Sequence, residues 1–204
     1  YLLMCTKAGV IKKTDLMEYQ NAPKAGKIAI RLDEGDELIR VKLTEGTSDI
    51  FVASHMGKMI RFNEKDVRDM GRVSRGVRAM TLDDGDYVIG MDTECENGKM
   101  LVVSEYGFGK KTELSEYKCQ SRGGKGTTTY KISDATGALA GMEIVTPNDD
   151  IMLITSEGII IRMDSEDIST YGRVTKGVRL MRFADGVSII SIAKVVKDPE
   201  DDSE

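Results

Sequence analysis

Runs of four apolar residues recur at nearly constant intervals along this chain, which has 204 residues. The runs lie at positions 2–5, 50–53, 100–103 and 151–154. The second and fourth runs show no polar alternation, a pattern typical of strands that are buried on both faces. A glycine-containing segment follows each run, so we expect the strand to turn back onto a hairpin partner, such as 59–62 or 159–163.

Two sets of glycines mark the same positions in every repeat of this pattern. The first set is Gly9, Gly57, Gly107 and Gly158, and the second set is Gly26, Gly76, Gly126 and Gly177. The steps are 48, 50 and 51 residues in the first set and 50, 50 and 51 in the second. A period of about 50 residues is typical of propellers and arrays, in which each unit buries one face against its neighbour.

Past the second glycine, the fourth and sixth residues are apolar or aromatic and the fifth is polar in every repeat. This alternation predicts a strand with one buried and one wet face, and turn residues at 33–36 and 83–86 separate it from a fourth strand. The segments 63–69 and 164–169 are each long enough for one helical turn. The pattern therefore predicts one all-β, propeller-like repeat domain over 1–197, with blades of about four antiparallel strands at about 1–48, 49–97, 98–148 and 149–197.

Charge changes this picture mainly at the end of the chain. The formal net charge is −5, but the segment 198–204 alone holds five acidic residues and no basic one. The remaining 29 basic and 29 acidic residues make a neutral body. A neutral body still binds a polyanion if its charges are segregated. We expect the segment 198–204 to be a disordered acidic tail, because it is rich in charge and poor in apolar residues.

Basic residues and glycines alternate in the long loops that lead to the second glycine. The loops read Gly-Arg-Val-Ser-Arg-Gly-Val-Arg at 71–78, Gln-Ser-Arg-Gly-Gly-Lys-Gly at 120–126 and Gly-Arg-Val-Thr-Lys-Gly-Val-Arg at 172–179. Glycine lets a phosphate approach backbone N–H groups, while Arg and Lys supply the charge. Because the repeat is spatial, we expect these loops to line one rim as a periodic basic track.

Three sets of residues are therefore candidates for phosphate contact. The loop set is Gln120, Arg122, Gly123, Gly124, Lys125, Gly126, Arg72, Arg75, Arg78, Arg173, Lys176 and Arg179. The first repeat adds Lys24 and Lys27 in its own loop. The third set, four residues past the first glycine, is Lys13, Arg61, Lys111 and Arg162. A solvated strand position is the competing interpretation for the third set, and structural closure of a blade is the competing role for Arg122 and Lys125.

The sequence offers no candidate for catalysis, for metal binding or for a small-molecule substrate. His55 is the only histidine, and the three cysteines, Cys5, Cys95 and Cys119, lack the C-x-x-C spacing of a metal site. Their odd number indicates ordinary thiols of a reducing compartment. No apolar stretch approaches the ~20 residues of a membrane span, and no P-loop is present, so we expect no cofactor and no membrane partner.

Several motifs resemble those of the C-terminal domain of DNA gyrase A. They are Tyr-Gly-Phe-Gly-Lys-Lys-Thr at 106–112, Gly-Arg-Val-x-x-Gly-Val-Arg from Gly71 and from Gly172, and Asp-Gly-Asp at 84–86. The segment 120–126 is similar to the gyrase A box of that family, Q-[RK]-R-G-G-[RK]-G, except that Ser121 replaces its second, basic residue. The resemblance covers the whole chain, and it places a box-like copy in the third repeat, whereas the principal box of the family lies in the first blade.

The resemblance implies a fold, a function and partners. The fold is a six-bladed β-pinwheel whose blades exchange a strand, of which this chain would hold the last four. The function is to bend and wrap double-stranded DNA for ATP-dependent negative supercoiling by a type IIA topoisomerase. The partners are the rest of gyrase A, together with gyrase B, in an A2B2 holoenzyme, in the nucleoid-containing cytoplasm of a bacterium. The cleaving tyrosine and the metal site of the family lie in other regions of the holoenzyme.

Two alternatives remain open at the level of sequence. The equivalent domain in the A protein of topoisomerase IV is the nearer one, although the box at 120–126 favours gyrase. A propeller that binds proteins and not DNA is the other, but such surfaces are usually aromatic, and this chain has no Trp and 5% aromatic residues. Electrophoretic shifts with long and short DNA, followed by a topology assay, distinguish a wrapping domain from a protein-binding propeller.

Overall fold

The computed structural model describes residues 1–197, so the prediction for the acidic tail at 198–204 lies outside the described residues. Its contacts divide the chain into two compact units. Unit 1 comprises Tyr1–Ser54, Lys58–Glu94 and Lys118–Thr127, and unit 2 comprises His55–Gly57, Cys95–Tyr117 and the chain from Thr128 onward. The prediction of one repeat domain over 1–197 stays a prediction, and each unit is described by itself.

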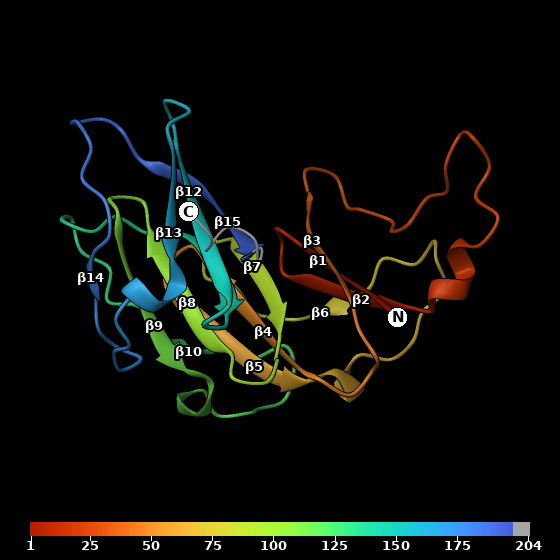
Figure 1. Ribbon diagram of the computed structural model, residues 1–204. Helices are drawn as coiled ribbons and strands as arrows, with labels where there is room; N and C mark the ends of the chain where they lie inside the picture. The colour runs from red at the N-terminus through yellow and green to blue at the C-terminus, as the bar shows by residue number, and fades with distance from the viewer. Residues whose placement is uncertain (198–204) are drawn as a thin grey trace. The chain divides into compact units, whose positions relative to one another are not determined.

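The strands of unit 1 form two antiparallel sheets (Figure 1). The first has the order β3-β1-β2-β6, with β1 (Leu2–Thr6), β2 (Val10–Thr14), β3 (Leu38–Leu43) and β6 (Val77–Arg78). The second has the order β10-β5-β4-β7, with β4 (Asp49–Ser54), β5 (Lys58–Asn63), β7 (Val88–Thr93) and β10 (Thr127–Thr128), which lies at the boundary of the units. The predicted hairpin of 50–53 with 59–62 is confirmed as the β4–β5 pair.

Unit 2 repeats this arrangement (Figure 1). One sheet has the order β11-β8-β9-β14, with β8 (Lys99–Ser104), β9 (Phe108–Glu113), β11 (Leu139–Val145) and β14 (Val178–Arg179). The other has three strands in the order β13-β12-β15, with β12 (Asp149–Thr155), β13 (Ile160–Asp164) and β15 (Ile189–Val196). The all-β fold with four antiparallel blades is therefore confirmed.

Single turns of 3-10 helix follow the second strand of each blade. They are η1 (Leu16–Tyr19), η2 (Glu64–Asp66), η3 (Leu114–Glu116) and η4 (Ser165–Asp167). Asn63 and Asp164 cap the turns at η2 and η4 by accepting a backbone N–H two residues on, as short polar side chains do at such positions. The helical turns predicted at 63–69 and 164–169 are thus confirmed.

Neighbouring repeats exchange their shortest strand. Strand β6 belongs to the second repeat but pairs with β2 of the first, with Ile11 opposite Val77. Strand β14 of the fourth repeat pairs in the same way with β9 of the third, with Gly109 opposite Val178. This exchange is the feature that the family resemblance implied, and it makes the first and third blades depend on the repeat that follows each of them.

Three of the four second glycines, Gly76, Gly126 and Gly177, allow this exchange, because they lie directly against the backbone of the neighbouring strand. All of them have a positive φ, between +69° and +107°. A Cβ atom on Gly76 would lie 2.7 Å from the Ile11 carbonyl oxygen, and one on Gly126 would lie 2.5 Å from that of Met59. Real Cβ atoms do not make such contacts, so these positions require glycine for packing between repeats.

The strand predicted past the second glycine is shorter than expected. Strands β6, β10 and β14 each have two residues, and the chain then leaves the sheet. In unit 1 the N–H groups of Ala79 and Met80 both donate to the Gly9 carbonyl, at 2.8 and 3.5 Å, so the regular ladder ends there. The predicted alternation gives the correct burial at the fourth residue, because Met80 is 2% and Met181 is 7% exposed, but not at the sixth, where Leu32 is 40% exposed.

Each unit has its own hydrophobic core. In unit 1, residues of β1, β4 and β5 such as Leu3, Val52 and Phe62 pack with Met80. In unit 2, residues of β8 and β12 such as Leu101 and Leu153 pack with Met181 and Ile189. The predicted burial on both faces is confirmed for 50–53, where all four residues are buried, but is wrong for 151–154, where Met152 and Ile154 are only half-buried. The cores hold the turns from which the basic loops start.

Candidate nucleic-acid interface

Each basic loop is fixed at its start by the residue four past the first glycine of the preceding repeat. The Lys13 carbonyl accepts from the Met70 N–H at 2.9 Å, and the Arg61 carbonyl accepts from the Gln120 N–H at 2.9 Å. In unit 2 the Lys111 carbonyl accepts from the Tyr171 N–H at 2.8 Å. The loops end at the second glycine, where the exchanged strand begins. Both ends are therefore held by backbone contacts, although the loops lie at the surface.

One arginine in each loop turns inward and clamps the repeat before it. Arg72 and Arg122 each donate from Nη1 at 2.5 Å, to the carbonyls of Ile28 and Arg78 respectively. Arg173 makes the same hydrogen bond to the Thr128 carbonyl in unit 2. Each acceptor lies two residues past the second glycine of the preceding repeat. Part of the hydrogen-bonding capacity of these three guanidinium groups is thus used inside the fold.

The box-like loop at 120–126 is joined to the second repeat along its backbone. The Gly123 N–H donates to the Ala79 carbonyl at 2.8 Å, and the Thr81 N–H donates to the Gly124 carbonyl at 2.9 Å. The Thr81 hydroxyl also donates to the Gly123 carbonyl at 2.7 Å. This arrangement supports the blade-closing role that the sequence left open, and DNA contact by Gln120 and the box glycines stays a prediction.

Two lysines that the sequence analysis did not single out support the loops from beneath. Lys12 and Lys110 are fully buried, three residues past the first glycine. The Lys110 ammonium donates to the carbonyls of Gly172 and Arg173 at 2.7 and 2.6 Å, and Lys12 donates in the same way to Ala29 and Arg72. The sequence could have revealed them, because the position three past the first glycine is lysine in these two repeats and isoleucine in the other two.

Burial of Lys110 predicts a pH dependence of stability. Burial lowers the pKa of Lys110 from 10.5 to about 8. Between these values the unfolded chain keeps a proton that the folded chain has lost, so the free energy of unfolding rises with pH in this window. Urea denaturation at about pH 7.5 and about pH 9.5 should show this rise in the wild type and a smaller rise in Lys110→Met. An equal rise in both proteins would contradict this assignment.

The residue before each second glycine points outward. The side chains of Arg75 and Lys125 are 60% and 69% exposed, and Lys176 is exposed as well. Arg75 forms an ion pair with Asp33, and Lys125 forms one with Asp83 at 2.5 Å. The hydrogen bond between the second pair raises the pKa of Lys125 and lowers the pKa of Asp83. Sequence analysis identifies both aspartates only as turn residues.

Two further arginines are exposed on the exchanged strands themselves. Arg78 lies on β6 and Arg179 on β14. The Arg179 guanidinium stands 4.5 Å from the centre of the Phe108 ring, and the Lys176 ammonium stands 5.8 Å from it. A cation over an aromatic face is attracted by the ring quadrupole and keeps its outer side open to an anion.

The third candidate set, four past the first glycine, is engaged in contacts inside the fold. Lys13 pairs with Asp69 at 3.2 Å, Arg61 with Asp49 at 2.8 Å, and Arg162 with Asp150 at 2.6 Å. The Lys111 ammonium donates to the Ser165 carbonyl at 2.5 Å. These contacts give the set a structural role, and its contact with DNA stays a prediction. In the first loop, Lys24 is exposed, whereas the Lys27 ammonium donates to the Gln20 carbonyl at 2.5 Å.

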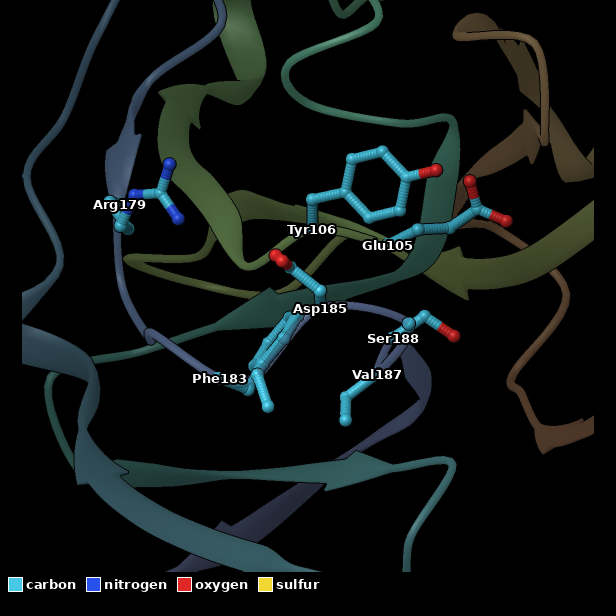
Figure 2. Close-up of a pocket in the computed structure, with 9 residues that line it drawn as sticks. Glu105, Tyr106, Arg179, Phe183, Asp185, Val187 and Ser188 are labelled. Atoms are coloured by element: carbon cyan, nitrogen blue, oxygen red, sulfur yellow. The ribbon is translucent and has the colours of Figure 1, made fainter.

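Surface hollows lie beside the exposed arginines in both units. In unit 1 a hollow of about 280 Å³ is lined by 8–10 and 75–78, with two arginines and no acidic residue in its lining. In unit 2 a hollow of about 420 Å³ is lined by Arg179 but also by Glu105 and Asp185. Figure 2 shows these side chains around Tyr106, with Arg179 and Glu105 on opposite sides of the ring. The unit 1 hollow is therefore the better match to an anion.

Other kinds of site find no support in the part of the chain that the structure describes. Residues 1–197 contain no group of three or more His, Cys, Asp or Glu side chains arranged to hold a metal ion. The same residues contain no helix of the length and apolarity that a membrane crossing needs. Cys5, Cys95 and Cys119 form no disulfide.

The blades are antiparallel, and a short strand of one repeat pairs with the sheet of the repeat before it. A basic, glycine-rich loop precedes each such strand. These features define a β-pinwheel of the DNA-topoisomerase type. The chain belongs to the family described as "DNA gyrase C-terminal domain, beta-propeller", whose model matches residues 1–45, 48–93, 98–146 and 149–195. The DNA gyrase A protein of Staphylococcus epidermidis is 43% identical over 206 residues, which cover 100% of this chain and 23% of that protein. The DNA gyrase A protein of Staphylococcus aureus is 41% identical over 205 residues, with the same coverage.

Solved structures agree with this assignment. A DNA gyrase A C-terminal domain is 30% identical, with a TM-score of 0.86 over 96% of this chain and 66% of that one. A C-terminal domain of DNA topoisomerase IV is 27% identical, with a TM-score of 0.90 over 96% of this chain and 62% of that one. The chain thus spans about a quarter of the curated relatives and about two thirds of the solved domains. The six-blade count of the complete domain stays a prediction.

Proposed function

We propose that this chain binds double-stranded DNA without reading its sequence, as the C-terminal domain of a gyrase A protein. The observation that carries the proposal is the recurrence of exposed Arg75, Lys125 and Lys176 at one register of successive repeats, on loops that are fixed at both ends. Cations on fixed loops contact phosphates and position the duplex, and they carry no base-specific information. Membership of the gyrase family supports the same partner.

In the complete enzyme we propose that these contacts bend and wrap DNA. Bending a duplex through tens of degrees costs on the order of several kcal/mol, which regularly spaced phosphate contacts offset. The wrapped segment would serve negative supercoiling by an A2B2 holoenzyme in the bacterial cytoplasm, in association with the nucleoid. In this proposal ATP hydrolysis and DNA cleavage belong to other parts of the holoenzyme, and the chain itself needs no cofactor.

Binding and wrapping are tested separately. If each blade neutralises about two phosphates, we expect tighter binding to long than to short linear duplex and a log K against log salt slope of roughly −7. Relaxation of closed circular DNA by a nicking-closing enzyme in the presence of the chain should leave supercoils of one sign once the protein is removed. Failure to shift duplex DNA at low salt would refute the binding proposal, and a shift without a topological change would refute wrapping alone.

The corresponding role in topoisomerase IV is the second candidate, because a solved topoisomerase IV domain shares the fold with a TM-score of 0.90. The identity with gyrase relatives, 43%, favours gyrase. The topology assay separates the two, since a domain that binds and bends DNA without chiral wrapping leaves no excess of supercoils of one sign.

A further inference from the structure

Two of the outward cations are held by a carboxylate at one repeated position. Asp33 and Asp83 both lie seven residues past the second glycine of their repeat. Arg75 and Lys125, their partners, both lie one residue before the second glycine of the next repeat. Both pairs lie inside unit 1, so their geometry does not depend on the placement of the units. Because the same ion pair recurs at the same register, it is a feature of the repeat and not a chance surface contact.

The loop at 172–179, which joins the fourth repeat to the third, lacks this carboxylate. Ser133 occupies the position of Asp33 and Asp83, and Lys176 occupies that of Arg75 and Lys125. Within residues 1–197 no ion pair to Lys176 is formed, and the ammonium stands 5.8 Å from the Phe108 ring. One chain thus contains two cations that are paired with a carboxylate and one that is not, at the same register.

A carboxylate on a cation takes the place that a phosphate oxygen would need. Both are anionic oxygens that accept charge-assisted hydrogen bonds from guanidinium or ammonium groups. Asp83 and Lys125 are 58% and 69% exposed, so solvent reaches the pair and an incoming phosphate can exchange with the carboxylate. An exposed pair of this kind is weak, which makes the exchange reversible and sensitive to salt.

We propose that Asp33 and Asp83 are intramolecular competitors of DNA, which occupy Arg75 and Lys125 until a phosphate displaces them. The loop that carries Lys176 then contacts DNA first, because no carboxylate has to be displaced from its ammonium group. The two aspartates lower the affinity of the unit 1 blades for DNA. They therefore favour phosphate contacts that form one after another and disfavour tight binding of other polyanions. This inference rests on the proposed DNA-binding function and adds a regulation to it.

The first test removes one competitor at a time in the full chain. At low salt, Asp83→Asn should raise the affinity for long duplex DNA by about two- to fivefold, the range set by a weak exposed ion pair. The gain should shrink as salt screens the pair. Asp84→Asn is the matched control, because it removes the same charge from the same turn and leaves the hydrogen bond of the pair intact. Asp84 attracts Lys125 only through space and more weakly than Asp83 does, so its removal should give a clearly smaller gain. Asp33→Asn and its neighbour Glu34→Gln form a second such set.

The gain must also depend on the cation. In the background of Lys125→Gln, the substitution Asp83→Asn should leave the affinity unchanged, because the competitor then has nothing to release. Conversely, Ser133→Asp places a carboxylate at the position equivalent to Asp83 and should lower the affinity, whereas Ser133→Asn should not. Circular dichroism and denaturation midpoints confirm that each variant is folded before its affinity is compared.

The outcomes separate the inference from the proposed function. Absence of DNA binding by the wild type would refute the function itself. Binding by the wild type with equal gains in Asp83→Asn and Asp84→Asn would show an effect of net charge and overturn the competitor role. No gain in Asp83→Asn, or a gain that persists in the Lys125→Gln background, would overturn it as well.

Discussion

Neutralising Arg75, Lys125 and Lys176 together is expected to weaken the binding of long duplex DNA by roughly 10²- to 10³-fold at low salt. Each cation is exposed and lies one residue before a second glycine. Each phosphate contact contributes about −0.9 to the slope of log K against log salt, so the triple substitution to glutamine should make that slope shallower by about three. Fluorescence anisotropy with a labelled long duplex over a salt series measures both quantities.

A charge-matched control makes this result interpretable. Lys7, Lys42 and Lys99 lie outside the basic loops and pair with Glu37, Asp92 and Glu113. Their triple substitution to glutamine removes the same formal charge and should change the affinity by no more than about twofold at moderate salt, because distant surface charges are screened. A loss in the control as large as in the loop variant would mean that DNA responds to net charge and not to the loops.

Much of the fold follows from local pattern. The buried run at 50–53 and its partner at 59–62 identify the β4–β5 hairpin, because strand burial and turn chemistry are encoded within about a dozen residues. The alternation past the second glycine identifies Met80 as buried but overstates the strand, since a sheet needs a partner as well as a pattern. Here the Gly9 carbonyl, some 70 residues away in the chain, takes the N–H groups that a ladder would use.

In the candidate site, too, local sequence predicts some features, whereas others depend on residues of another repeat. Sequence identifies the basic loops but does not separate Arg72, which turns inward, from Arg75, which turns outward, three residues later. That choice depends on the carbonyl of Ile28 in the preceding repeat, a contact that no local pattern contains. The buried Lys110 and the paired Asp83 escape sequence analysis for the same reason, since their partners come from the next repeat.

The sequence pattern suggests that the second glycines are openings for phosphate, which stays a prediction for Gly126, and the structure gives three of them a packing role. Gly76, Gly126 and Gly177 lie against a neighbouring backbone, where a Cβ atom does not fit. Gly71 and Gly172 are open by comparison, since a Cβ on Gly71 would meet nothing within 4 Å and one on Gly172 only a side-chain oxygen at 3.9 Å. The glycines at the loop start are therefore the more open positions for close phosphate approach, and the glycines at the loop end also serve strand exchange.

Replacing Gly177 with alanine is expected to lower the free energy of unfolding by about 3–4 kcal/mol, the sum of a left-handed alanine and an overpacked contact. Its φ is +69°, and a Cβ there would lie 2.7 Å from the Gly109 carbonyl carbon, at the point where β14 joins β9. Urea denaturation of the purified variant measures the loss.

Gly26→Ala is the matched control, because Gly26 has the same register and a φ of +78° but nothing within 4 Å of the added Cβ. It should cost only about 1–2 kcal/mol, which is the cost of the left-handed conformation. Equal losses in the two variants would mean that backbone conformation alone fixes these glycines. A larger loss at Gly177 would mean that glycine recurs at positions 76, 126 and 177 because strands are exchanged between blades. The packing of the sheets would then set the spacing of the basic loops.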